Sequence, residues 1–316
     1  MQTPEGKTRY LLLWLDMTPI GPPNLMAIRR AIEEKVDQPK DDVEIDLWLE
    51  SPGGDANAAY KLALILRHVA GRVRVVIPDY AKSAATLLAL VGDEIYLAPG
   101  AELGPLDAQM PEEGSYSGSI SALNIARAAD EVAREAVSLA VEGGADLLVI
   151  TGLSRAQTLD ALLRFSASFS EPLVRQLDPK LVHHAKQMLR VTARYAERLL
   201  KLTGHANAEQ IAMRLVENFP THGFVIAYDE ARELGLPVRA MAEYDLLSSA
   251  RAFHRIAEDG QAMIEFGRLD EFLSASDNAE ERDEGGEHEE VKPADEDAAE
   301  SGPNGSEASP EHAQRT

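Results

Sequence analysis

The sequence predicts an α/β fold in which a parallel sheet is followed by a helical C-terminal part. Over the first 110 residues, short apolar runs that fit buried strands alternate with patterns of helical periodicity. Strands separated by helices require crossover connections, which make neighbouring strands parallel. After Met110, a polar stretch rich in glycine and serine gives way to long helical patterns. With 316 residues, 45% of them apolar, the chain can bury a sizeable core.

The alternation begins with an apolar run at residues 9–17, which fits a buried strand. Leu25, Ile28 and Ile32 then recur at helical spacing within residues 24–36. Side chains alternate between apolar and polar from Val43 onward, as in a strand. The further elements predicted in this half are a strand at 43–51, a helix at 56–69, a strand at 72–78, a helix at 83–92 and a strand at 93–99.

The second half predicts helices, with a break in the pattern at the glycine pair near Gly143. Residues 221–238 predict a short strand and then a helix closed by Gly235. The clearest helical patterns are residues 181–202 and 207–219. We therefore expect one domain over residues 1–240, an amphipathic helical extension over 241–275 and a tail over 276–316.

Charge is concentrated in the tail, which holds 14 of the acidic residues against 3 Lys or Arg. With so few large apolar side chains the tail cannot offset its ordering entropy, so we expect it to be disordered. The net charge of −22 argues against nucleic acid or an anionic membrane as a main partner. No apolar run is long enough to span a membrane, and cysteine is absent. A cytoplasmic protein is the expectation.

Two adjacent glycines follow the second predicted strand, in the stretch Ser51–Pro52–Gly53–Gly54. Glycine adopts backbone angles that other residues avoid, so a tight loop is expected at the carboxyl end of this strand. Its N–H groups, together with the positive end of the next helix, favour an anion or an oxygen that gains negative charge. A plain strand-to-helix turn is the alternative interpretation.

Ser83 follows the third predicted strand and opens a helix. A serine in this position can simply cap the helix. However, Ala84 and Ala85 leave room for a substrate, and open α/β sheets bind ligands at the carboxyl ends of their strands. Ser83 and the glycine loop are therefore expected at the same edge of the sheet.

These motifs resemble the Clp-protease/crotonase superfold over residues 10–240. The stretches that carry the resemblance are 51–54, 81–109 and Asp229–Val238, and the serine dehydrogenase proteinase family is the nearest match, with signal peptide peptidase A also similar. The resemblance implies a spiral of βαβ units. It implies Ser83 as nucleophile, with the backbone N–H groups of Gly53 or Gly54 and of Ala84 as an oxyanion hole. The implied reaction is peptide-bond hydrolysis through an acyl-enzyme, in a ring-shaped homo-oligomer.

A serine hydroxyl needs a base to take its proton. The segment about 25 residues after Ser83, where the Clp subunit has its histidine, contains Asp107 and no histidine. His222 lies close to where the Clp subunit has its aspartate. We therefore expect the two roles to have exchanged segments, with His222 as base and Asp107 orienting it. A lysine base, Lys180 or Lys186, is the alternative.

Other functions stay open at this point. A crotonase-like enzyme acting on acyl-CoA thioesters would use the same glycine loop without a serine nucleophile, and a non-catalytic oligomeric scaffold would have no working base. No metal-binding or phosphate-binding motif is found, so no metal and no cofactor are expected. The expected partner is a polypeptide substrate. An unfoldase partner stays open, because nothing in the sequence identifies one.

Overall fold

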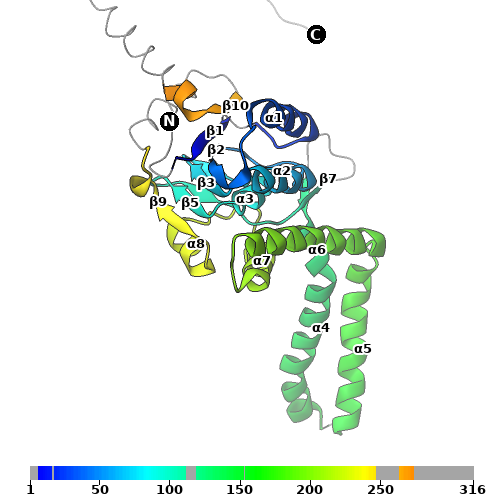
Figure 1. The fold of residues 1–316 in the computed structure, drawn as a ribbon. Helices are drawn as coiled ribbons and strands as arrows, with labels where there is room; N and C mark the ends of the chain where they lie inside the picture. The colour runs from blue at the N-terminus through cyan, green and yellow to red at the C-terminus, as the bar shows by residue number, and fades with distance from the viewer. Residues whose placement is uncertain (1–5, 16–17, 112–118, 153, 247–262, 274–316) are drawn as a thin grey trace, which may run out of the picture. The chain divides into compact units, whose positions relative to one another are not determined.

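A six-stranded sheet forms the centre of the computed structural model, which describes residues 6–15, 18–111, 119–152, 154–246 and 263–273 (Figure 1). All its strands are parallel except β10, which pairs antiparallel with β1. In spatial order they are β10 (Met263–Arg268), β1 (Thr8–Leu15), β2 (Val43–Leu49), β3 (Arg72–Ile77), β5 (Glu94–Leu97) and β9 (Val238–Ala240). The predicted α/β class and the parallel sheet are confirmed.

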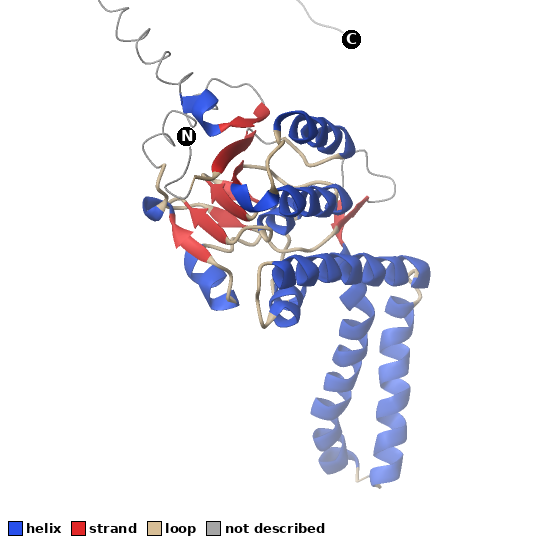
Figure 2. Cartoon of the chain, in the orientation of Figure 1, coloured by secondary structure: helices blue, strands red, loops and turns tan. Residues whose placement is uncertain are grey.

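Three helices pack on one face of this sheet: α1 (Pro22–Lys35), α2 (Ala56–Val69) and α3 (Ala84–Ala89) (Figure 2). Successive side chains of a strand point to opposite faces, so alternate residues of β1 enter the core beneath these helices. Tyr10 and Trp14 belong to this core and are fully buried. The predicted strands and helices of the first half all form, with ends that shift by a few residues.

The opposite face of the sheet carries a second apolar cluster. Leu11 and Leu13 of β1 pack there with Trp48, and the cluster also includes Met241 and Tyr244. Met241 lies in a short 3₁₀ helix, η2 (Met241–Glu243), directly after β9. The segment that follows the last parallel strand therefore covers part of this face.

Buried charges lie on that same face, in the first half of the strands. The carboxylate of Asp46 is fully buried and accepts hydrogen bonds from Arg9 Nε at 2.8 Å and from Arg74 Nη1 at 3.1 Å. The hydroxyl of Tyr244 donates to the same carboxylate at 2.5 Å. Burial raises the pKa of the Tyr244 phenol, and the neighbouring Asp46 carboxylate raises it further.

Short elements shape the loops at both ends of the strands. A 3₁₀ turn, η1, precedes β2, and two pairs of short strands follow β3 and β5. They are η1 (Lys40–Asp42), β4 (Tyr80–Ala81) paired with β6 (Glu102–Leu103), and β7 (Gln109–Pro111) paired with β8 (Ser119–Ser121). The sequence predicts none of them, because each is too short to show a period.

The helical part begins with two long helices that pack against each other, α4 (Ala122–Thr151) and α5 (Arg155–Val174). The predicted break near Gly143 was wrong, because α4 runs through it without interruption. The packed neighbour supplies contacts that offset the low helix propensity of glycine. The remaining helices are α6 (Pro179–Leu202), α7 (Ala208–Glu217) and α8 (Tyr228–Leu234).

The predicted helical extension over residues 241–275 was wrong at Met263–Arg268, which forms strand β10. Pairing with β1 supplies the backbone hydrogen bonds of an edge strand, and the ring of Phe266 stacks on Tyr10 with centroids 5.4 Å apart. The predicted disordered tail over 276–316 lies outside the described residues. Among the residues that are described, no helix is long and apolar enough to cross a membrane.

Candidate active site

Ser83 has a strained backbone. Its φ of 50° and ψ of −116° make it the only non-glycine residue with positive φ in the described part of the chain. Although Ser83 is the residue before α3, its hydroxyl makes no capping hydrogen bond, so the simple cap interpretation fails. Conformations of this kind cost about 1–3 kcal/mol and occur mostly at functional sites. In α/β hydrolases a strained strand-to-helix turn exposes the nucleophile.

The glycine loop lies directly against the Ser83 turn. Gly53 has a φ of 107°, and a Cβ atom added to it would lie 2.7 Å from the carbonyl oxygen of Lys82 and 3.1 Å from the amide nitrogen of Ala84. Two backbone hydrogen bonds join the turns, from Ser51 N to Tyr80 O at 3.1 Å and from Lys82 N to Ser51 O at 3.0 Å. Only a glycine allows this close approach.

Of the three predicted oxyanion-hole residues, two have an N–H group that nothing else uses. The N–H of Gly53 donates to the hydroxyl of Ser51 at 3.2 Å. The N–H groups of Gly54 and Ala84 have no hydrogen-bond acceptor among the residues described. Both residues line the cavity that contains Ser83, so their N–H groups are available to an oxygen bound there.

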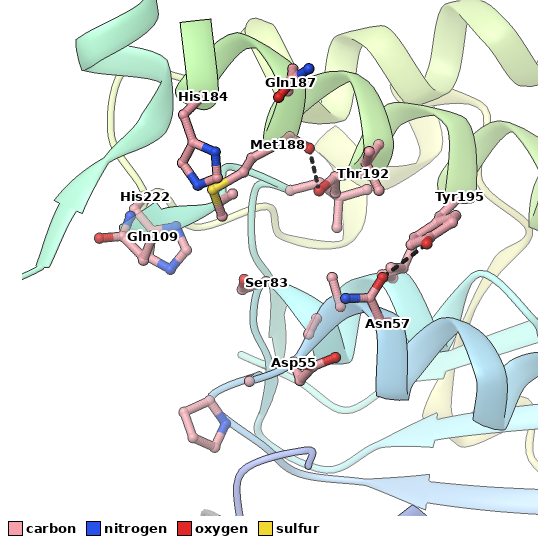
Figure 3. A pocket seen from close by; sticks show the side chains of 18 residues that line it. Asp55, Asn57, Ser83, Gln109, His184, Gln187, Met188, Thr192, Tyr195 and His222 are labelled. Carbon is pink, nitrogen blue, oxygen red and sulfur yellow. Dashed lines mark hydrogen bonds between the residues drawn. The ribbon is translucent and has the colours of Figure 1, made fainter. Parts of the chain in front are cut away.

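The cavity has a volume of about 650 Å³ and lies between the sheet edge and α6 (Figure 3). The Ser83 turn and the first turn of α2 form one side. One face of α6 forms another, and a loop after α7 contributes a histidine. The polar residues that line it are Asp55, Asn57, Ser83, Gln109, His184, Gln187, Thr192, Tyr195 and His222.

His222, the predicted base, lines this cavity together with Ser83 (Figure 3). Its Nδ1 atom is buried and has no hydrogen-bond partner within the described residues. Apo sites often have looser contacts than the substrate complex, so shared lining of one cavity is compatible with a catalytic pair. The fold places Ser83 and His222, which lie far apart in the sequence, in the lining of the same cavity.

Asp107 has a different position. It is 2% exposed, does not line the cavity, and its Oδ1 accepts the N–H of Leu123 at 3.0 Å, in the first turn of α4. No hydrogen bond joins Asp107 to His222. The expected pairing of the two side chains is therefore absent, and Asp107 stabilises a helix terminus instead.

The lysines predicted as alternative bases lie away from Ser83. Lys186 is 3.8 Å from Asp130 of α4, and neither Lys180 nor Lys186 lines the cavity. Lys82, next to Ser83 in the chain, turns its amine to Glu102 at 2.6 Å. No lysine is among the residues that line the cavity, so a lysine base has no support here.

Sequence reasoning missed His184, which lines the cavity from α6. His184 shares a helix face with Met188, Val191 and Tyr195, which line the cavity too. This spacing of four, three and four residues is visible in the sequence and could have identified the face. The spacing could not show which part of the fold this face of α6 packs against. Among the described residues, no group of three His, Asp or Glu side chains could hold a metal ion.

Comparison with known families gives one match. Residues 25–141 match the family model of the ClpP-like SDH-type serine proteinases. The matched range contains the glycine loop, Ser83 and Asp107, and it ends before α6 and His222. The family match therefore includes the part of the cavity lining that contains Ser83. It does not include the part contributed by α6 and His222.

Two curated relatives come from Methanocaldococcus jannaschii, the uncharacterized proteins MJ0137 and MJ1495. The first is 31% identical over 215 residues, which is 68% of this chain and 57% of the relative. The second is 27% identical over 199 residues, which is 63% of this chain and 53% of the relative. The chain thus spans little more than half the length of either relative.

Among solved structures, the chain is similar to two forms of the 1510-N membrane-bound stomatin-specific protease. The match to one form has a TM-score of 0.43 and 15% sequence identity. It covers 78% of this chain and 86% of the chain of the solved structure. The match to the other form, which is in complex with a substrate peptide, has a TM-score of 0.44 and 16% sequence identity. It covers 77% of this chain and 79% of the chain of the solved structure.

Proposed function

Because residues 25–141 match the family model of the ClpP-like SDH-type serine proteinases, we propose that the protein hydrolyses peptide bonds with Ser83 as its nucleophile. The observation that carries the proposal is the conformation of Ser83. Its φ of 50° is strained, and its hydroxyl opens onto a cavity without serving as a helix cap. A merely structural serine in this turn gains nothing from such strain.

The proposed reaction begins with proton transfer from the Ser83 hydroxyl to His222 as Oγ forms a bond to the carbonyl carbon of the substrate. The N–H groups of Gly54 and Ala84 stabilise the negative charge that develops on the carbonyl oxygen. When the tetrahedral intermediate collapses, the C–N bond breaks and His222 returns the proton to the departing amine. Water then attacks the acyl-enzyme, with the same histidine as base, and releases the acid.

Neither Asp107 nor a lysine has a part in this proposal. Asp107 is used at the start of α4, and Lys180 and Lys186 lie outside the cavity. His222 therefore acts without a carboxylate partner among the described residues. Loss of the third residue of a serine-protease triad lowers kcat by about 10⁴-fold, which is less than the roughly 10⁶-fold loss that follows removal of the nucleophile or base, so a serine–histidine pair still catalyses.

A fluorophosphonate probe tests the nucleophile. We expect it to label the protein at Ser83, as located by mass spectrometry of proteolytic fragments. Ser83→Ala should abolish labelling, and His222→Ala should slow it by about 10³-fold or more, since the hydroxyl loses its base. His184→Ala is the matched control on the same cavity, and we expect a change of less than tenfold.

Two results would contradict the proposal. A folded protein that the probe leaves unlabelled would favour the non-catalytic scaffold. Turnover of an acyl-CoA thioester that Ser83→Ala barely changes would favour the crotonase-like alternative, which needs no serine nucleophile. The homo-oligomer and the unfoldase partner stay predictions from the family resemblance.

A further inference from the structure

Asn57, in the first turn of α2, is held by a tyrosine from the other side of the cavity. The hydroxyl of Tyr195, on α6, donates to Asn57 Oδ1 at 2.9 Å. The ring of Tyr195 stacks on Tyr60 of α2, with centroids 4.1 Å apart and planes 4° apart. Two independent contacts therefore fix the position of the Tyr195 hydroxyl.

In this hydrogen bond the oxygen end of the Asn57 amide faces Tyr195. A side-chain amide has one acceptor oxygen and one NH₂ group, and the two ends exchange when it rotates by half a turn. Because the oxygen accepts from Tyr195, the nitrogen is directed to the opposite side. In Figure 3 the Asn57 nitrogen points away from Tyr195, to the side of the cavity where Ser83 lies.

The NH₂ group of Asn57 has no acceptor among the residues described, although Asn57 lines the cavity. The proposed function assigns the unpaired N–H groups of Gly54 and Ala84 to the reacting carbonyl, so the Asn57 amide is free for another group. A polypeptide that crosses the cavity brings further carbonyl groups, and each one loses its hydrogen bonds to water on binding. An amide donor that lines the same cavity as the nucleophile meets this need.

We propose that Asn57 binds a backbone carbonyl of the polypeptide substrate, other than the reacting one, and that Tyr195 is the positioning residue that orients its amide. This inference rests on the proposed function of the site. Asn57 stabilises the bound substrate and the transition state equally, because the carbonyl that it binds does not change charge. Its loss should therefore raise KM and leave kcat unchanged.

Steady-state hydrolysis of fluorescein-labelled casein tests this directly. A single hydrogen bond contributes about 0.5–1.5 kcal/mol, so Asn57→Ala should raise KM roughly two- to tenfold, with kcat within about twofold. Asn57→Asp keeps the acceptor for Tyr195 but has no NH₂ group, so we expect a KM at least as high. Tyr195→Phe preserves the ring stack and allows the amide to rotate, and should raise KM about two- to threefold. Tyr60→Phe removes a phenol from the same stack and is the matched control, with no change in KM.

A second measurement separates this inference from the proposed function. Fluorescence anisotropy of the labelled casein with Ser83→Ala protein reports binding without turnover. The double variant with Asn57→Asp should bind about two- to tenfold more weakly. If the fluorophosphonate fails to label Ser83, the proposed function fails and the anisotropy comparison still decides the role of Asn57. Unchanged KM and affinity in both Asn57 variants, a fall in kcat alone, or absence of casein binding would each overturn the inference.

Discussion

The cavity around Ser83 and the buried charges around Asp46 differ in whether their polar groups have hydrogen-bond partners. In the cavity, the N–H groups of Gly54 and Ala84 have no acceptor within the described residues, and Ser83 has a strained backbone. Around Asp46, three donors satisfy one carboxylate that is fully buried. Buried polar groups are normally hydrogen-bonded, so the unpaired N–H of the buried Ala84 indicates where a ligand binds, whereas Gly54 is exposed. We propose that the first region serves binding and chemistry, and we expect the second to contribute to stability.

Substitution of Asp46 is expected to have the largest effect, which is on the free energy of unfolding. Asp46→Ala leaves the guanidinium groups of Arg9 and Arg74 buried beside a missing carboxylate. Breaking a buried ion pair from one side costs about 3–5 kcal/mol, and we expect the free energy of unfolding to fall by about that amount. Urea denaturation followed by circular dichroism measures it.

Asp245→Asn is the matched control for Asp46→Ala. Asp245 pairs with the same Arg9 at 2.6 Å, but its side chain is 60% exposed. The Arg9 hydrogen bond lowers the pKa of the Asp245 carboxyl, and the exposed pair contributes at most about 1 kcal/mol. Equal losses for the two variants would show that burial does not distinguish the pairs.

The next effect in size is expected at Gly54. A Cβ atom there would lie 2.3 Å from the carbonyl oxygen of Ile20, at a φ of 137°, so Gly54→Ala must displace the loop. Removing one oxyanion donor costs about 10²–10³ in kcat. We expect a fall in fluorophosphonate labelling rate and in casein hydrolysis of about this size.

Gly100→Ala is the control for Gly54→Ala. Gly100 also has positive φ, at 84°, but a Cβ atom there meets nothing within 4 Å. Its substitution should lower stability by about 1 kcal/mol and leave the labelling rate unchanged. A Gly54→Ala protein that labels as fast as Gly100→Ala would remove Gly54 from the site.

The smallest effect is expected from relieving the strain at Ser83. Glycine adopts a φ of 50° without steric cost, so Ser83→Gly should raise the free energy of unfolding by about 1 kcal/mol while abolishing activity. Ser121→Gly is the control, because Ser121 has a φ of −63° and its side chain caps α4. That variant should lose a few tenths of a kcal/mol in the same urea experiment. A larger loss for Ser83→Gly than for Ser121→Gly would mean that the Ser83 turn stores no strain.

Local sequence patterns predicted the parallel sheet and its helices because each pattern repeats within a few residues. The period of two in β2 and the spacing of Leu25, Ile28 and Ile32 are set by the geometry of the element that contains them. Ser83 and the glycine loop could be predicted together for a similar reason. Both follow parallel strands, whose carboxyl ends share one edge of the sheet.

Strand β10 and the continuity of α4 could not be predicted, because partners distant in the sequence decide them. β10 pairs with β1 across about 250 residues, and α4 is supported by α5. A local pattern states which side chains are apolar and does not state what covers them. For this reason residues 263–268 were assigned to a helix, and Gly143 to a break.

The sequence by itself determined four parallel strands of the sheet, the helices between them and the serine and glycine turns, because these depend on short-range periodicity and on backbone angles that glycine alone allows. Only the tertiary structure decided the other side of the cavity. The contact between Asn57 and Tyr195 joins residues 138 apart, and packing of α6 and the loop after α7 places His184 and His222 in the lining of the cavity that contains Ser83. The physical reason is that the backbone of a helix sets the direction of each of its side chains. Which residue that side chain contacts depends on how the helix packs against the rest of the fold.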